Sequence, residues 1–165
     1  MAPNGQKLRV MDVLERTVRS HGPRPAVRVK RHGSWKTTSW NEYRHQVRQV
    51  ARALISLGTQ PGSGVCIIGY NCPEWFFADI GSIYAGAVPA GIYTTSSPEQ
   101  CEYIANHCEA AVVFVENQEQ LAKFVAVRAK LPNLKALVLM QGESNTSAFK
   151  FGSLARTATN FASCS

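Results

Sequence analysis

The feature that most constrains this chain is a regular alternation between short apolar runs and helix-length segments across its central part. The apolar runs show no apolar–polar alternation, which is typical of strands buried on both faces. Parallel strands joined by right-handed crossovers place the helices against the sheet. We therefore predict an α/β fold of three layers, with a mostly parallel sheet built from βαβ units. The strands are expected at 65–69, 88–93, 111–115 and 134–140, and the helices between them at 73–85, 98–108 and 117–130.

Helix-capping motifs support these boundaries. Ser97-Pro98-Glu99-Gln100 is a capping box with proline in the first helical turn, and Ser39-Trp40-Asn41-Glu42 is a second capping box. The second box begins a helix over 40–57, and Gly58 is expected to end it in a left-handed conformation. Ahead of this helix, we predict an amphipathic helix over 9–19 and a β-hairpin with strands at 26–30 and 35–39.

The last part of the chain does not continue this pattern. Residues 141–165 are rich in serine, threonine, alanine and asparagine and have no helical or strand period. We predict one domain over 1–140, followed by an irregular or disordered tail over 141–165.

Composition narrows the class of protein. The chain has 165 residues, of which 45% are hydrophobic, so it can form a core of ordinary domain size. No apolar run reaches the roughly 18–20 residues that cross a bilayer, and the first ten residues lack an apolar signal core. The five cysteines form no CxxC pair, and an odd number does not indicate a disulfide framework. A cytoplasmic, reducing location is expected.

Charge is distributed unevenly along the sequence. Residues 1–60 carry 12 basic and 3 acidic side chains, whereas residues 61–165 carry 6 basic and 8 acidic ones. The basic first third is compatible with nucleic acid, an anionic membrane surface or a phosphorylated ligand. A solvated surface is the favoured interpretation, and peripheral membrane contact stays open. Nucleic acid is not expected as a partner, because Trp35 and Trp40 suit a hairpin and a helix start.

Two loops are candidates for a ligand site. In open parallel sheets ligands bind at the carboxyl ends of strands, where we expect 69–71 and 93–96. Both loops could present amides and hydroxyls to an anionic ligand, or their polar groups could only cap helices. The pattern Gly62-Ser63-Gly64 is a turn and no dinucleotide loop, because it precedes a strand. The spacing of serine, histidine and aspartate residues along the sequence indicates no catalytic triad.

A metal site at Cys101, His107 and Cys108 is not expected. On one helix, residues 101 and 108 are two turns apart, or roughly 10 Å. Zinc needs its ligands at about 2.0–2.3 Å, so these two cysteines cannot share one ion.

Taken together, several segments resemble one family. The segments IGYNCPEW (68–75), AGAV (85–88) and GIYTTSSPE (91–99) resemble the beginning of adenylate-forming, AMP-binding acyl-CoA synthetases. The last segment is most similar to bubblegum-type long-chain fatty acid–CoA ligases. The resemblance extends over about residues 8–140, and it implies the partial N-terminal domain of such an enzyme.

The resemblance implies an activity for the complete enzyme. ATP and a fatty acid would give an acyl-adenylate and diphosphate, and CoA would then release acyl-CoA and AMP. Such enzymes need ATP, magnesium and CoA, whereas no cofactor is expected in this chain. Their loop TSGTTGxPKG is not in the sequence, so the chain is expected to be truncated before the ATP-binding loop and inactive alone.

The resemblance also points to residues and partners. It implies that Tyr93, Thr94 and Thr95 lie near bound CoA; it assigns no catalytic or metal-binding residue in this chain. Fatty acid and CoA would be ligands of the complete enzyme. Apolar surface left open would favour self-association. The alternative is a non-catalytic α/β binding or regulatory module that associates with an intact synthetase.

Overall fold

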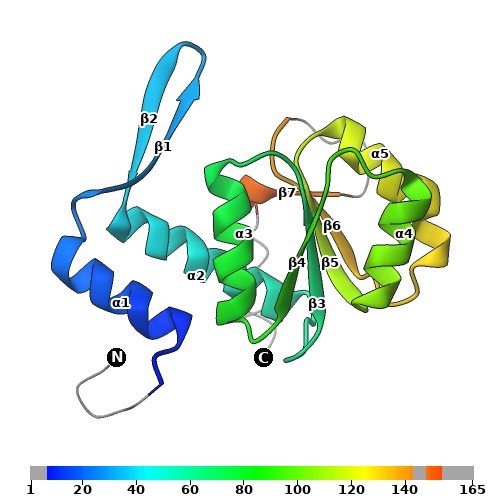
Figure 1. The fold of residues 1–165 in the computed structure, drawn as a ribbon, viewed down its shortest axis with the longest axis horizontal. Helices are drawn as coiled ribbons and strands as arrows, with labels where there is room; N and C mark the ends of the chain where they lie inside the picture. The colour runs from blue at the N-terminus through cyan, green and yellow to red at the C-terminus, as the bar shows by residue number, and fades with distance from the viewer. Residues whose placement is uncertain (1–6, 143–147, 154–165) are drawn as a thin grey trace.

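A five-stranded parallel sheet forms the centre of the computed structural model, which describes residues 7–142 and 148–153 (Figure 1). The strand order is β4-β3-β5-β6-β7, and every neighbouring pair is parallel. The α/β class and the mostly parallel sheet expected from the sequence are confirmed. The strands are β3 (Gly64–Ile68), β4 (Val88–Ile92), β5 (Ala110–Val115), β6 (Ala136–Leu139) and β7 (Phe149–Lys150).

Helices cover both faces of this sheet (Figure 1). The chain moves from β3 to β4 in one direction and then passes back over β3 to reach β5. Right-handed crossovers in opposite directions place their helices on opposite faces. One face carries α1 (Val10–His21), α2 (Trp40–Ser56) and α3 (Pro73–Tyr84); the other carries α4 (Pro98–His107), α5 (Gln118–Val127) and the 3₁₀ turn η1 (Arg128–Lys130).

Strand β3 separates two hydrophobic cores. Val65 and Ile67 pack in the core beneath α2 and α3, whereas Cys66 and Ile68 pack in the core beneath α4 and α5. All four side chains are fully buried. Both faces of this strand exclude water, so it needs apolar side chains at every position. This explains why its sequence shows no apolar–polar alternation, as predicted.

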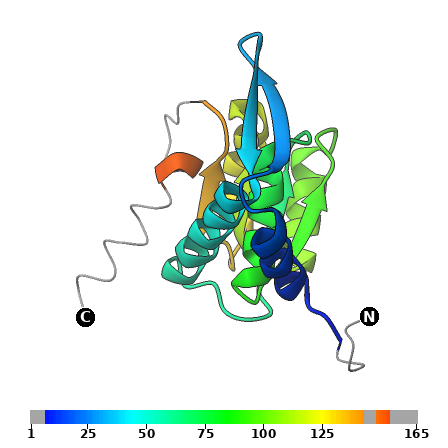
Figure 2. The ribbon, with the colours of Figure 1, turned by 90° about the vertical axis from the view of Figure 1, so that its left-hand side faces the viewer.

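The predicted hairpin projects from the body of the molecule (Figure 1). Its strands, β1 (Pro25–Arg31) and β2 (Ser34–Ser39), are antiparallel, and Gly33 has the positive φ of +77° that the turn requires. The Arg31 guanidinium donates to the Glu74 carboxylate at 2.6 Å, which connects the hairpin to the first turn of α3. Figure 2 shows the hairpin, α1 and α2 on the same side of the protein.

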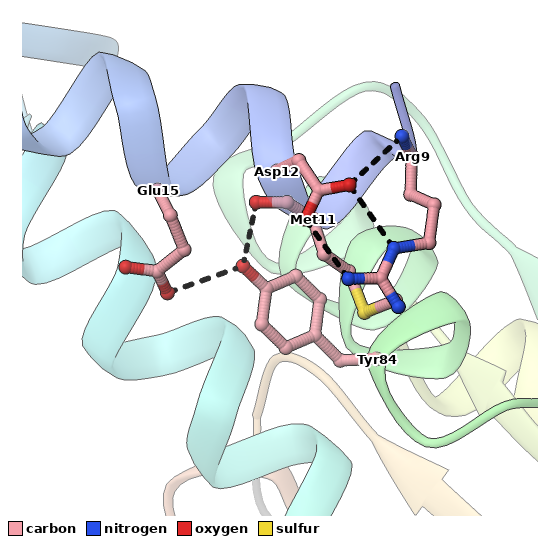
Figure 3. Close-up of polar contacts among 5 residues, drawn as sticks. All are labelled: Arg9, Met11, Asp12, Glu15 and Tyr84. Atoms are coloured by element: carbon pink, nitrogen blue, oxygen red, sulfur yellow. Dashed lines mark hydrogen bonds and ion pairs between the residues drawn. The ribbon is translucent and has the colours of Figure 1, made fainter. Parts of the chain in front are cut away.

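Helix α1 is docked onto the domain through apolar and polar contacts. Leu14 and Val18 are buried in the core. The Tyr84 hydroxyl of α3 lies beside this helix, 3.5 Å from the Met11 carbonyl and 3.4 Å from a Glu15 carboxylate oxygen (Figure 3). Partial burial opposes ionisation of Glu15, but hydrogen bonds and charges from two arginines of α2 outweigh it and lower the pKa of this carboxyl. The arginines are Arg44 and Arg48.

Two apolar elements each leave part of their surface uncovered, as the sequence predicts for a segment that lacks part of its packing partners. They are the strand expected at 88–93 and the helix expected at 73–85. Strand β4 lies at an edge of the sheet, where Val88 remains 57% exposed. Helix α3 buries one side against α2, and Phe76 on its other side is 39% exposed. Apolar composition alone could not show which face of each element stays uncovered, because that depends on strand order.

The structure also differs from expectation after residue 140. Within the predicted irregular segment, the two residues of β7 pair with β6, and a 3₁₀ turn η2 (Phe151–Ser153) follows. Phe151 packs against Phe77 and Phe114 of the core. A strand of two residues has no period that sequence analysis could detect. Residues 143–147 and 154–165 lie outside the described residues.

The packing of β3 generates a prediction about Gly64. A Cβ atom at this position would overlap the backbone carbonyl oxygen of Cys108. Backbone cannot rotate away, so Gly64→Ala should lower the free energy of unfolding by about 2–3 kcal/mol in a urea titration. Gly152→Ala is the matched control, because no atom lies within 4 Å of its added Cβ. Equal stability of the two variants would contradict this packing.

Candidate functional site

An open hollow lies where β3 and β4 end, at the upper end of the sheet in Figure 1. Its volume is about 450 Å³, and its lining combines aromatic rings, hydroxyls and glycine backbone. The two loops singled out in the sequence meet here. The lining residues are Gly69, Tyr70, Asn71, Trp75, Gly91, Ile92, Tyr93 and Thr94.

The topology explains why the hollow forms at this place. The loop after β3 leads to α3 on one face, whereas the loop after β4 leads to α4 on the opposite face. Adjacent strands whose loops diverge in this way leave a crevice between them, and such crevices are the usual ligand sites of open α/β sheets. The hollow is therefore a product of strand order.

The crevice on the other side of β3, towards β5, is closed. The Glu116 carboxylate accepts a hydrogen bond from the Tyr70 amide at 3.1 Å, and the Glu116 amide donates to the Ile68 carbonyl at 2.9 Å. A Cβ atom at Gly69 would lie 2.7 Å from the Glu116 Cβ, so a side chain does not fit there. Close packing thus leaves only the β3–β4 crevice open.

Two side chains of α5 hold the loop after β4. Lys123 Nζ donates to the Thr94 carbonyl at 2.6 Å, and Gln120 Nε2 donates to the same oxygen at 3.4 Å. Gln120 is only 3% exposed. Our sequence analysis missed both residues. Their spacing of three places them on one helix face, but nothing local in the sequence connects that face to a loop 26–29 residues earlier.

Helix capping accounts for part of the polar groups that the sequence left open. The Ser97 hydroxyl accepts from the Gln100 amide at 3.3 Å, and the Gln100 side chain accepts from the Ser97 amide at 2.8 Å, so the predicted capping box is present. The Tyr70 amide is also occupied, by Glu116. The capping interpretation therefore holds for Ser97 and Gln100, whereas the Tyr70 amide is satisfied by a contact between two loops.

Other groups remain accessible to a ligand. Tyr93 is 84% exposed and Tyr70 is 70% exposed, and both line the hollow. Thr94 is half-buried and also lines it, whereas Thr95 is exposed outside the lining. Aromatic rings beside a few hydroxyls and an amide suit an elongated ligand with apolar and polar parts.

A buried cysteine, Cys72, directly follows the lining residue Asn71. Cys72 is the N-cap residue before α3, and burial raises the pKa of its thiol, which keeps it protonated at neutral pH. In the described part of the chain, no three His, Cys, Asp or Glu side chains gather closely enough to hold a metal ion.

Comparison with known proteins adds an independent finding. The family model for AMP-binding enzymes matches residues 14–159. The long-chain-fatty-acid–CoA ligase ACSBG2 of Xenopus laevis is 41% identical over 134 residues, which are 81% of this chain and 18% of that ligase. The long-chain-fatty-acid–CoA ligase ACSBG1 of Rattus norvegicus is 43% identical over 121 residues, 73% of this chain and 17% of that ligase.

A solved structure shows the same fold. The anthranilate CoA ligase AuaEII, crystallised with anthranoyl-AMP, superposes with a TM-score of 0.80 and 27% sequence identity. The match covers 88% of this chain and 27% of that ligase. The chain thus spans less than a fifth of the length of the two curated ligases above.

The closure at Glu116 can be tested directly. Glu116→Ala removes the acceptor of the Tyr70 amide, and a hydrogen bond to a charged group contributes about 1.5–3 kcal/mol. Hydrogen exchange at the Tyr70 amide should therefore accelerate about tenfold or more. Glu119→Ala, on the first turn of α5, should leave that amide unchanged. Unaltered exchange in Glu116→Ala would show that the carboxylate does not hold this loop.

Proposed function

Because this chain belongs to the AMP-binding enzyme family, we propose that it forms part of a bubblegum-type long-chain fatty acid–CoA ligase. The observation that carries this proposal is its identity of 41–43% with two long-chain-fatty-acid–CoA ligases over most of its length. The complete enzyme would use ATP, magnesium and CoA to convert a fatty acid into acyl-CoA, with release of AMP and diphosphate.

Within that enzyme, the proposed role of this segment is to bind CoA. Tyr93, Thr94 and Thr95 form the loop that would contact it. The position of Tyr93 and Thr94 in the hollow supports this role, because the crevice lies at the diverging ends of β3 and β4. Aromatic faces and hydroxyls suit CoA, which joins a nucleotide to an amide-containing arm.

Preorganisation of this loop would contribute to binding. Lys123 and Gln120 hold the Thr94 carbonyl from α5, and the Ser96 amide donates to the Tyr93 carbonyl at 3.0 Å. A loop fixed in this way loses little conformational entropy when a ligand binds. The Tyr93 ring, in contrast, is free to adjust to the ligand because it is largely exposed.

The test combines binding and turnover. Calorimetric titration of the 165-residue chain with CoA should show binding, and replacing Tyr93, Thr94 and Thr95 together by alanine should raise the Kd by about tenfold or more. Tyr103→Ala, which removes a tyrosine that is 70% exposed away from the hollow, should leave the Kd unchanged. An equal effect of both variants would contradict the CoA site.

Turnover assays test the proposed ligase role separately from the proposed CoA site. With palmitate, ATP, magnesium and CoA, we expect no acyl-CoA from the 165-residue chain, because the loop TSGTTGxPKG is not in its sequence. In the complete Xenopus ligase, alanine at the positions aligned with 93–95 should raise the KM for CoA and leave the KM for ATP unchanged. Turnover by the short chain would refute its proposed dependence on the rest of the enzyme.

We further propose that the basic amino-terminal third contacts an anionic membrane surface from the cytoplasm. No described helix is long and apolar enough to span a bilayer. All three carboxylates of residues 1–60 already have partners within the chain, namely Asp12, Glu15 and Glu42. Apart from Arg31, which pairs with Glu74, the basic side chains in excess over these three carboxylates would attract anionic lipid headgroups.

The hairpin carries the part of this surface that is best suited to contact an anionic membrane. Lys30 pairs directly with Trp35 across the strands, and Arg28 lies two residues before Lys30, so the three side chains share one face. Trp35 is 67% exposed. Leu8, Val10 and Val13 of the α1 region are exposed. Figure 2 shows α1 on the side of the molecule that also presents the hairpin.

Vesicle binding tests the membrane contact. The chain should sediment with phosphatidylserine-containing vesicles and much less with neutral phosphatidylcholine vesicles. Arg28→Gln with Lys30→Gln should weaken this binding about thirtyfold, since each basic residue near such a surface contributes about 1 kcal/mol. Arg52→Gln with Lys130→Gln changes the net charge equally but leaves the hairpin intact. Equal losses in both double variants would reject the hairpin as the contact.

A further inference from the structure

Two cysteines that have no part in the proposed CoA site lie side by side. Cys66 is in the middle of β3, and Cys108 directly follows α4, so 42 residues separate them in sequence. Their sulfur atoms are 3.3 Å apart. Cys66 is fully buried, whereas Cys108 is partly exposed. One thiol of the pair is therefore shielded and the other can meet a small solute.

The electrostatics of the pair favour reaction at Cys108. The hydrogen bond with Cys66 lowers the pKa of the Cys108 thiol to about 7, so a substantial fraction is thiolate at neutral pH. Burial raises the pKa of Cys72 and of Cys101, which keeps both as unreactive thiols. Among the described cysteines, Cys108 thus combines access, thiolate character and a neighbouring thiol.

We propose that Cys66 and Cys108 form an oxidisable pair, in which hydrogen peroxide converts the two thiols into a disulfide. The Cys108 thiolate attacks one peroxide oxygen, which forms an S–O bond, breaks the O–O bond and leaves a sulfenic acid on Cys108. The Cys66 sulfur then attacks the sulfur of Cys108, which forms the S–S bond and expels water. Overall, two thiols and one peroxide give one disulfide and two waters.

The order of these steps follows from burial. The oxidant reaches Cys108 first, and Cys66 acts as the resolving thiol because it is already in contact with Cys108 and is inaccessible to solvent. The product links β3, which leads to the loop at Gly69, with α4, which follows the loop at Thr94. Oxidation would therefore connect the elements that carry both loops of the hollow.

Peptide mapping provides the test in the otherwise intact chain. Cys164→Ser is used as the background, so that exchange through Cys164 does not join two molecules. After treatment with hydrogen peroxide and alkylation, the chain should lose two of its four remaining thiols and recover them with dithiothreitol. Cleavage after glutamate places Cys66 in 43–74, Cys101 in 100–102 and Cys108 in 103–109. A linked product of 43–74 with 103–109, assigned to Cys66 by further cleavage after Tyr70, is expected.

Two variants separate this pair from general cysteine oxidation. Cys66→Ala should prevent the disulfide and leave a sulfenic acid on Cys108 that dimedone traps, whereas Cys101→Ala should form the disulfide as before. A link from Cys108 to another cysteine, or further oxidation of Cys108 without a disulfide, would overturn the proposal. The peptide map of the background chain decides the outcome even where a variant does not fold.

Discussion

Burial of β3 on both faces is the constraint on which the rest of this structure depends. Its side chains from Val65 to Ile68 are completely excluded from water. A strand of this kind needs a hydrogen-bonded neighbour on each side and helices on both faces. Strands β4 and β5 supply the neighbours, and α3 and α4 are the crossovers that deliver them. The chain must therefore reverse its direction across the sheet after β4.

That reversal also creates the site. Loops that diverge from adjacent strands leave space between them, and two such crevices flank β3. The crevice towards β5 is filled by the close approach of Gly69 to Glu116. The crevice towards β4 stays open and presents Tyr70 and Tyr93. The burial of β3 on both faces and the position of the hollow thus both follow from the reversal of the chain after β4.

Exposed apolar surface marks where this segment would meet other partners. Strand β4 is an edge strand, and an edge presents unpaired backbone groups that another strand can join. Val88 and Phe76 lie uncovered near this edge and on α3. In a protein several times longer, such as the ligases it resembles, further elements of the same chain would be suitable cover. Self-association of this segment alone stays a prediction for the same physical reason.

The sequence by itself determined the elements and their class. Capping boxes at Ser39 and Ser97 begin α2 and α4 where predicted, Gly58 takes its left-handed conformation, and apolar runs without alternation mark buried strands. These signals are local, since capping bonds and hydrophobic periods act over a few residues. The family resemblance also rests on short runs of contiguous residues.

Tertiary structure alone decided which groups meet. It placed β4 at an edge, paired β7 with β6, brought Lys123 to the Thr94 carbonyl and set Cys66 against Cys108. The two side-chain contacts join residues 29 and 42 positions apart, and the strand placements depend on strand order, so no local pattern reports them. Strand order follows from the joint packing of all helices on the sheet, which is a property of the whole fold.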